Sequence, residues 1–206
     1  SRTPSGECAA PVAADIAALG KHTKITSVAI FGGVGMGPQQ QALKRGVPLG
    51  AGGSRLLRGN HAEHEALEEE AASFFGSETA LYFSTGFAAN AAIAATLPRE
   101  GDLIVYDALI HASFRDGLEP ARIQAIEAPH NDVNAMDAII AGWRAGGGKG
   151  RVWIAAETLY SMDGDRAPLG DLVALAAKQD AMLLLDEAHA TGVHGDQGRG
   201  LGARYE

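Results

Sequence analysis

An apolar run that ends in a carboxylate and an imidazole is the part of this sequence best suited to chemistry. Residues 181–185 are all apolar, and Asp186 and His189 follow closely after them. A continuous apolar run is typical of a strand that is buried on both faces of a parallel sheet. Such sheets bind ligands just beyond the carboxyl ends of their strands. Because an unpaired buried charge is unfavourable, Asp186 needs a partner there, and a protonated heterocyclic nitrogen would serve.

The four residues 186–189 also spell the DEAH box of helicases, in which the acid holds magnesium beside a nucleotide. That function requires an upstream phosphate loop of the form GxxxxGK(S/T). The nearest candidate, residues 146–150, lacks both the earlier glycine and the Ser or Thr after its lysine. A formal net charge of -8 also disfavours a phosphate-backbone partner. The sequence therefore predicts no nucleic-acid partner and no metal site.

Three further groups follow segments that are expected to be strands. The amides of Gly86 and Phe87 would open a helix, where free N–H groups can hold a phosphate, although an ordinary tight turn is the alternative. His111 follows another strand, and a satisfied surface or core histidine is the alternative there. Ser161 lies in an acidic segment, residues 157–165, whose Asp-Gly pair is also typical of a turn.

The elements that must position these groups alternate between strand and helix from residue 80 onward. This alternation predicts an α/β fold with a mostly parallel sheet covered by helices. Residues 1–45 are expected to form an irregular N-terminal arm, and residues 46–206 a single domain. The strands are predicted at 80–84, 103–106, 123–126, 152–157 and 181–186, and the helices at 88–97, 112–118, 133–144 and 169–178.

Length and composition limit the class of protein. A chain of 206 residues that is 46% hydrophobic can bury a core in one domain. A single cysteine, Cys8, excludes an internal disulfide framework and fits a reducing compartment, so a cytoplasmic location is expected. No apolar stretch approaches the roughly 20 residues of a membrane span, and no secretory signal is visible. Because the first residue is Ser1, the chain is expected to be a processed, engineered or excerpted product.

Six motifs in a fixed order give the sequence a resemblance to a known family. Together they resemble the α-oxoamine synthases, which belong to the fold-type-I aminotransferase superfamily and use pyridoxal 5′-phosphate. The resemblance runs from about residue 46 to residue 202. The motifs are Gly50-Ala-Gly-Gly-Ser54, Ser84-Thr-Gly-Phe-Ala-Ala-Asn90, His111-Ala-Ser113, His130-Asn-Asp-Val133, Ser161-Met-Asp-Gly-Asp165 and Asp186-Glu-Ala-His-Ala-Thr-Gly192.

The resemblance implies a cofactor site within the large domain of such an enzyme. Pyridoxal phosphate acts as an electron sink, which the protein orients and tunes. By this likeness Asp186 would pair with the pyridine nitrogen and keep it protonated. His189 would hydrogen-bond the phenolic oxygen of the cofactor, and Ser161 would contribute near the same edge.

The resemblance also implies the remaining contacts and the reaction. His111 would stack on the cofactor ring and contact the carboxylate region of the substrate, while Gly86 and Phe87 would supply backbone amides to the phosphate. The family reaction removes the α-proton of an amino acid, attacks an acyl thioester, and releases CoA and carbon dioxide. The complete enzyme is expected to be a homodimer that binds an amino acid and an acyl-CoA.

The choice of substrates leaves several alternatives. The motifs at 50–54 and 130–133 favour the branch of the family that joins L-alanine to a pimeloyl thioester, such as pimeloyl-CoA, in biotin synthesis. The branches that join serine to palmitoyl-CoA, or that use glycine, are alternatives. A different class of function is a non-catalytic fold-half module that pairs with a complementary chain.

Two departures from the family pattern bear on activity. The Schiff-base lysine of the family lies beyond the last residue of this chain, and residues 31–41 differ from the usual arm. The large domain is therefore expected to be incomplete at its C-terminal end, and the isolated chain is expected to be inactive.

Overall fold

The computed structural model describes residues 54–55, 59–121 and 123–205. The predicted arm, its boundary at residue 45 and most of the motif at 50–54 lie outside the described residues. The chain divides into two compact units, residues 1–69 and 70–206, and the division falls inside helix α3 (Ala62–Phe75).

In the first unit, Arg55 ties the segment before α3 to the helix. Its guanidinium donates to Glu68 Oε1 at 2.6 Å and to Asn60 Oδ1 at 2.7 Å. Asn60 donates in turn to Glu65 Oε1 at 2.7 Å. These polar contacts fix the start of α3, none of whose residues is buried.

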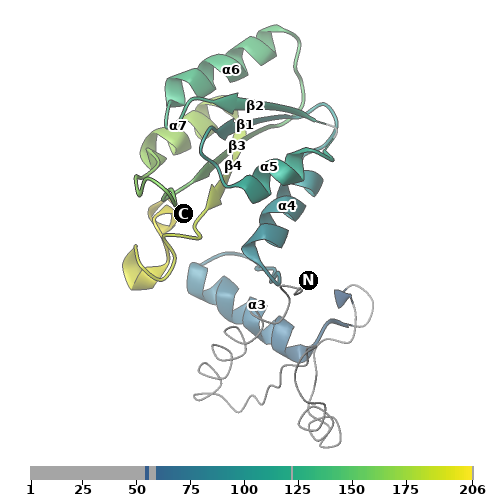
Figure 1. The fold of residues 1–206 in the computed structure, drawn as a ribbon, viewed down its shortest axis with the longest axis vertical. Helices are drawn as coiled ribbons and strands as arrows, with labels where there is room; N and C mark the ends of the chain where they lie inside the picture. Colours follow the sequence, from purple (N-terminus) through teal and green to yellow (C-terminus); the bar gives the residue numbers. More distant parts are fainter. Residues whose placement is uncertain (1–53, 56–58, 122, 206) are drawn as a thin grey trace, which may run out of the picture. The chain divides into compact units, whose positions relative to one another are not determined.

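The second unit is built on a four-stranded parallel sheet (Figure 1). Its strands are β1 (Leu103–Asp107), β2 (Gln124–Ala128), β3 (Val152–Glu157) and β4 (Ala181–Asp186), in the spatial order β2-β1-β3-β4. The register pairs Glu157 directly with Asp186. The carboxyl ends of β3 and β4 therefore place two acids side by side.

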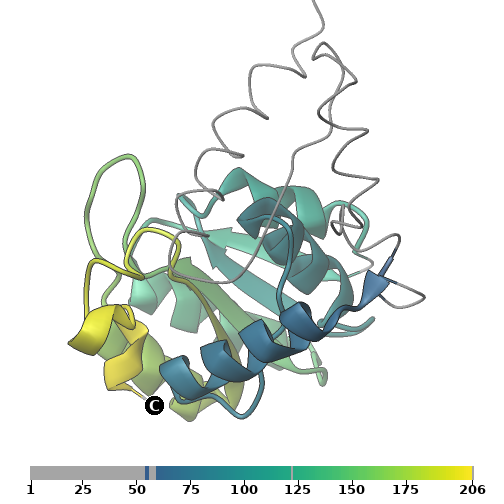
Figure 2. The ribbon, with the colours of Figure 1, turned by 90° about the horizontal axis from the view of Figure 1, so that it is seen from below.

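Helices cover both faces of this sheet (Figures 1 and 2). They are α4 (Gly86–Thr96), α5 (Ala112–Leu118), α6 (Val133–Ala145) and α7 (Leu169–Gln179). Alternate residues of a strand point to opposite faces. Accordingly, Leu103 and Ile154 pack in the core with α6 and α7, whereas Ile104 and Trp153 pack in a second core with α4 and α5.

The contact between α4 and α5 depends on one glycine. A Cβ atom at Gly117 would lie 2.6 Å from the backbone oxygen of Ala91 and 2.9 Å from the Cβ of Ala94. Small residues on both helices therefore let the two backbones approach closely. This approach sets α5, and the loop before it, against the start of α4.

The predicted fold class is confirmed, and the four strands and helices α4 to α7 agree with their predicted bounds to within two residues. The strand predicted at 80–84 is wrong, because these residues form no regular element. A strand exists only through a ladder with a neighbour, and no described strand pairs with this segment. Along the described residues, none of the helices is long and apolar enough to cross a membrane.

Candidate active site

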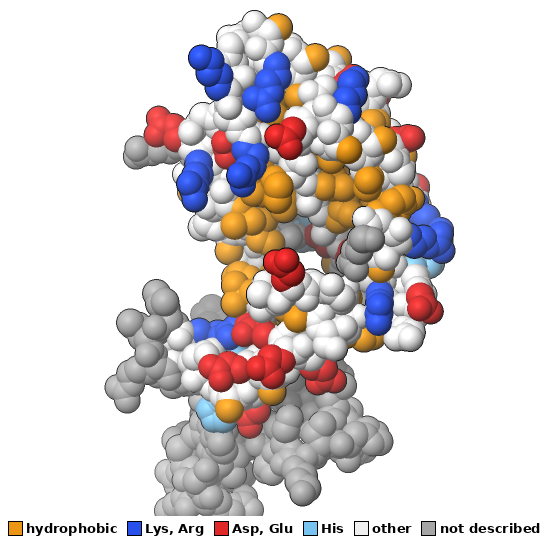
Figure 3. Space-filling model, turned by 180° about the vertical axis from the view of Figure 1, so that it is seen from behind, with side chains coloured by type: hydrophobic (Ala, Val, Ile, Leu, Met, Phe, Trp, Pro, Cys, Tyr) orange, Lys and Arg blue, Asp and Glu red, His pale blue; other side chains and the backbone are white. Residues whose placement is uncertain are grey.

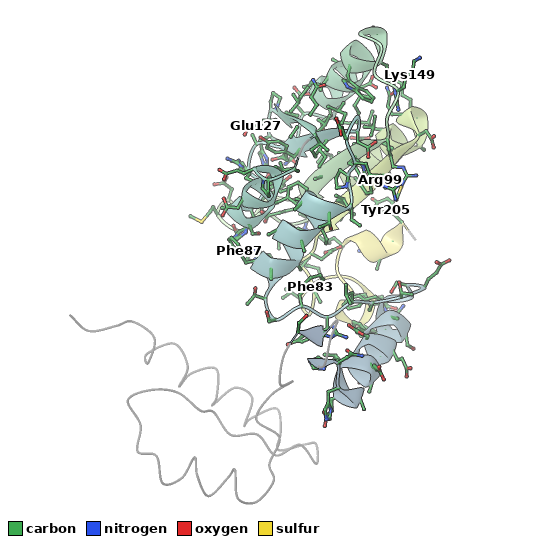
Figure 4. The ribbon with its side chains drawn as sticks, turned by 90° about the vertical axis from the view of Figure 1, so that its right-hand side faces the viewer. Phe83, Phe87, Arg99, Glu127, Lys149 and Tyr205 are labelled. Atoms are coloured by element: carbon green, nitrogen blue, oxygen red, sulfur yellow. The ribbon has the colours of Figure 1, made fainter. Side chains whose placement is uncertain are left out.

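A pocket of about 630 Å³ lies at the carboxyl ends of β3 and β4. The start of α4, the loop before α5 and the residues after β4 bound it, and Figure 4 shows Phe87 beside the first turn of α4. Ser161 does not line this pocket and lies exposed in the turn after β3, so its role stays a prediction. The other five predicted site residues all line it: Gly86, Phe87, His111, Asp186 and His189.

The carboxylate of Asp186 is held in place by two donors. Its Oδ2 atom accepts from Asn90 Nδ2 at 2.7 Å, and its Oδ1 atom accepts from the backbone N–H of Ala188 at 2.9 Å. Asn90 comes from α4, so this contact joins the helix to the end of β4. The two bonds fix the orientation of the carboxylate and leave lone pairs for a further partner.

His111 is the N-cap of α5 and is connected to Asp186 through the same network. Its Nδ1 atom accepts from the backbone N–H of Ser113 at 3.2 Å and lies 2.7 Å from Ser113 Oγ. Ser113 Oγ accepts in turn from Asn90 Nδ2 at 3.1 Å. Because Nδ1 is an acceptor, the neutral ring carries its proton on Nε2.

Glu157 is a buried acid of this pocket, with only 2% of its surface exposed. Burial raises the pKa of its carboxyl, and the neighbouring charge of Asp186 raises it further. His111 and His189 act in the opposite direction. Glu157 is therefore a carboxyl group that takes up a proton more readily than an ordinary glutamate.

The first turn of α4 offers free backbone donors. Thr85 caps the helix by accepting from the N–H of Ala88 at 3.0 Å. The N–H groups of Gly86 and Phe87 make no hydrogen bond within the described part of the chain. Since the helix dipole adds positive potential at this end, these amides are suited to an anion such as a phosphate.

The loop after β4 is pinned by Glu187. Its carboxylate accepts from Thr158 Oγ1 at 2.7 Å and from the backbone N–H groups of Leu201 at 3.1 Å and Gly202 at 2.5 Å. A Cβ atom at Gly200 would lie 2.6 Å from this carboxylate. Glu187 therefore ties the two ends of the segment that carries His189.

A partly buried ion pair supports the loops around the pocket. His130 Nδ1 lies 2.8 Å from Asp107 Oδ1, and His130 Nε2 lies 2.8 Å from Asp165 Oδ2. Burial opposes the charged ring, but the hydrogen bonds to both carboxylates outweigh it and raise the pKa of His130. Asp107 also accepts from the backbone N–H of Leu109 at 2.8 Å. The ion pair thus holds the loop that leads to His111.

Sequence reasoning missed five polar residues that line the pocket: Asn90, Ser113, Glu157, Glu187 and Thr191. Four of them lie inside the quoted motifs, whereas Glu157 ends an apolar strand as Asp186 does. The position of Glu157 at the end of a strand could have predicted that it lies beside Asp186, because neighbouring parallel strands bring their carboxyl ends to one edge.

Comparison with known proteins identifies the family. Residues 35–205 match the aminotransferase class I and II family. The chain belongs to that family. It is 45% identical over 157 residues to an 8-amino-7-oxononanoate synthase of Geobacter sulfurreducens, covering 76% of this chain and 39% of the relative. It is 47% identical over 152 residues to the corresponding protein of Mycolicibacterium smegmatis, covering 74% of this chain and 39% of the relative.

Solved structures agree with this assignment. A serine palmitoyltransferase of Sphingomonas wittichii is 38% identical with a TM-score of 0.72, over 80% of this chain and 40% of its own. An 8-amino-7-oxononanoate synthase from Francisella tularensis is 31% identical with a TM-score of 0.60, over 70% of this chain and 40% of its own. The resemblance to the α-oxoamine synthases is thus confirmed, with pyridoxal phosphate as the cofactor of the family. The chain spans about two fifths of the length of these relatives.

Proposed function

We propose that this chain forms the cofactor-binding part of an α-oxoamine synthase, which joins an amino acid to an acyl thioester and releases CoA and carbon dioxide. One observation carries the proposal. The carboxylate of Asp186 is oriented by Asn90 and by the N–H of Ala188, in a pocket that His111 and His189 also line. Such a fixed carboxylate is the partner that a protonated pyridine nitrogen needs.

The donor set of the pocket fits pyridoxal phosphate. The phosphate would be held by the free amides of Gly86 and Phe87, and the pyridine nitrogen by Asp186. Bound pyridoxal phosphate supplies an electron sink for negative charge that develops at the α-carbon of an amino acid. By holding a proton on the pyridine nitrogen, Asp186 would preserve that capacity.

The remaining residues would orient the cofactor and the substrate. His111, with its proton on Nε2, would cover one face of the ring, and His189 would hydrogen-bond the phenolic oxygen. Burial and the charge of Asp186 raise the pKa of Glu157, so this carboxyl takes up a proton more readily than an ordinary glutamate. Ser161 is kept as a proposed contributor near the phenolic edge.

We propose L-alanine and pimeloyl-CoA as the substrates, in biotin synthesis, because the relatives named 8-amino-7-oxononanoate synthase are 45–47% identical to this chain. Serine with palmitoyl-CoA is a second candidate, because a serine palmitoyltransferase superposes with a TM-score of 0.72. A glycine-using branch is a third. We further propose a cytoplasmic homodimer for the complete enzyme.

A non-catalytic role for this chain alone is the candidate from another class. No lysine lines the pocket within the described residues, whereas the family uses a lysine to bind the cofactor covalently. The chain would then hold the cofactor through Asp186 and the amides alone, or would act as one half of a fold. The catalytic candidate requires residues 46–206 to act as the cofactor-binding domain, whereas a fold-half role does not.

Titration with pyridoxal phosphate tests the proposal. Binding is measured by cofactor absorbance and by tryptophan fluorescence for the chain, for Asp186→Ala and for the control Asp171→Ala. Asp171 lies on α7 outside the pocket, and its replacement removes the same charge. We expect at least about a tenfold loss of affinity in Asp186→Ala, which corresponds to about 1.4 kcal/mol, and no loss in the control. Equal binding by all three proteins would contradict the assignment.

A further inference from the structure

A second pocket, of about 620 Å³, lies at the amino ends of β3 and β4. Each strand has six residues, so at about 3.3 Å per residue this pocket is about 20 Å from the candidate active site. Nine lysines and arginines are described between residues 70 and 205. Four of them line this pocket, on a chain whose net charge is -8: Arg99, Arg144, Lys149 and Arg151.

The backbone that carries two of these arginines is fixed by one carboxylate. Asp102 accepts from the backbone N–H of Arg99 at 3.0 Å, from that of Arg151 at 2.8 Å and from Trp153 Nε1 at 3.1 Å. Burial opposes the charge, but these hydrogen bonds and the nearby charge of Arg151 outweigh it and lower the pKa of Asp102. The acid therefore joins the segments that carry Arg99 and Arg151, and three donors already engage its oxygens.

The segment that carries Lys149 is fixed by Arg144. Its Nη1 atom donates to the carbonyl oxygens of Gly148 at 3.2 Å and Gly150 at 2.8 Å. A Cβ atom at Gly150 would lie 2.0 Å from the carbonyl oxygen of Gly101, so only glycine allows this approach. The cationic residues thus come from two segments that are locked side by side.

Three of the cationic groups have no hydrogen-bond acceptor among the described residues. The side-chain nitrogens of Arg99, Lys149 and Arg151 donate no hydrogen bond to the described residues, and the Arg151 guanidinium lies 5.9 Å from the centre of the Trp153 ring. Figure 4 shows Arg99 and Lys149 on the same side of the α/β unit, and Figure 3 shows Lys and Arg side chains gathered over the upper part of the face seen from behind. Leu97 and Met182, which are 48% and 46% exposed, give the pocket an apolar wall.

We propose that this pocket binds a phosphorylated small molecule, with its phosphates on Arg99, Lys149 and Arg151 and its apolar part against Leu97 and Met182. Guanidinium groups match the geometry of phosphate oxygens and bind them in charge-assisted pairs. A phosphate would also relieve the mutual repulsion of cations that the backbone holds together. The lining carboxylates, Asp102 and Asp180, leave a net positive charge.

Isothermal titration calorimetry of the chain with inorganic diphosphate and with ADP tests the proposal at low ionic strength. The double variant R99Q/R151Q is compared with K178Q/R204Q, which removes two positive charges outside the pocket. We expect the wild-type chain to bind both probes. The affinity should fall about tenfold or more in R99Q/R151Q and change by less than about twofold in the control. Circular dichroism checks that each variant is folded. The single variant K149Q breaks no hydrogen bond within the described residues, and its affinity for the probes should fall about threefold or more.

Each outcome decides part of the proposal. ADP binding more tightly than diphosphate supports the apolar wall, and equal binding overturns that part. Absence of binding by both probes, or the same loss in R99Q/R151Q and in the control, overturns the site itself. The result is independent of the proposed activity, because Asp186 does not line this pocket.

Discussion

Replacing His130 with Asn tests whether a partly buried imidazolium holds the loops of the candidate active site. The ring lies 2.8 Å from both Asp107 and Asp165. A hydrogen bond to a charged group contributes about 1.5–3 kcal/mol to stability. The bond to buried Asp107 should reach this value, whereas the side chain of Asp165 is 41% exposed and its bond is worth about 1 kcal/mol or less. We expect a loss of about 2–4 kcal/mol in the free energy of unfolding at pH 6.

The loss should depend on pH because the pKa of His130 is raised above its usual 6.5. The stabilisation is fully present below the pKa of the unfolded chain and is lost as the pH rises through the higher folded-state pKa. Above that pH the neutral ring has one N–H and can donate to only one of the two carboxylates. The difference in stability between wild type and His130→Asn should therefore shrink as the pH rises from 6 to 9.

Urea unfolding followed by tryptophan fluorescence measures this difference, because both tryptophans, Trp143 and Trp153, lie in the α/β unit. The matched control is His189→Asn, since the ring of His189 makes no hydrogen bond within the described residues. The control should change stability by less than about 0.5 kcal/mol. An equal loss in both variants, or a loss in His130→Asn that does not change with pH, would refute the reasoning.

Three further predictions concern packing and activity. Gly117→Val should destabilise the α/β unit by about 1–3 kcal/mol or more, seen as a lower Tm, because its side chain would meet the backbone of Ala91; an unchanged Tm would contradict the close approach of α4 and α5. In a version of the protein that contains the Schiff-base lysine, steady-state kinetics should show turnover nearly abolished in Asp186→Ala and reduced more mildly in His189→Ala. The 206-residue chain itself should release no CoA from pimeloyl-CoA and L-alanine in a thiol assay, because no lysine lines the described pocket to act as the base, and general base catalysis alone contributes a factor of about 10²–10⁴ to the rate. Stoichiometric borohydride labelling of one lysine, together with turnover, would overturn this prediction.

Much of the fold could be predicted because its signals are local. Continuous apolar runs gave β3 and β4 with their observed bounds, and the alternation of strands with helices gave the parallel sheet. The segment 80–84 has the same apolar character, yet forms no strand. Its state depends on a neighbour to pair with, and a sequence window does not contain that neighbour.

The candidate site was predictable at the level of the residues that follow each strand. Asp186 and His111 were placed at one rim because parallel strands end at a common edge. The bridge between them through Asn90 and Ser113 was not predicted, since it joins residues up to 96 positions apart. The raised pKa of Glu157 was also missed, because it depends on burial and on the register that pairs β3 with β4.

Nitrogen NMR of pyridoxal phosphate labelled with ¹⁵N in its ring tests the central claim most directly. The cofactor is bound to the wild-type chain and to Asp186→Asn, which keeps the size of the side chain and removes its charge. We predict the chemical shift of a protonated pyridine nitrogen in the wild type and that of an unprotonated nitrogen in the variant. The same protonation state in both proteins would show that Asp186 is not the partner of the cofactor ring.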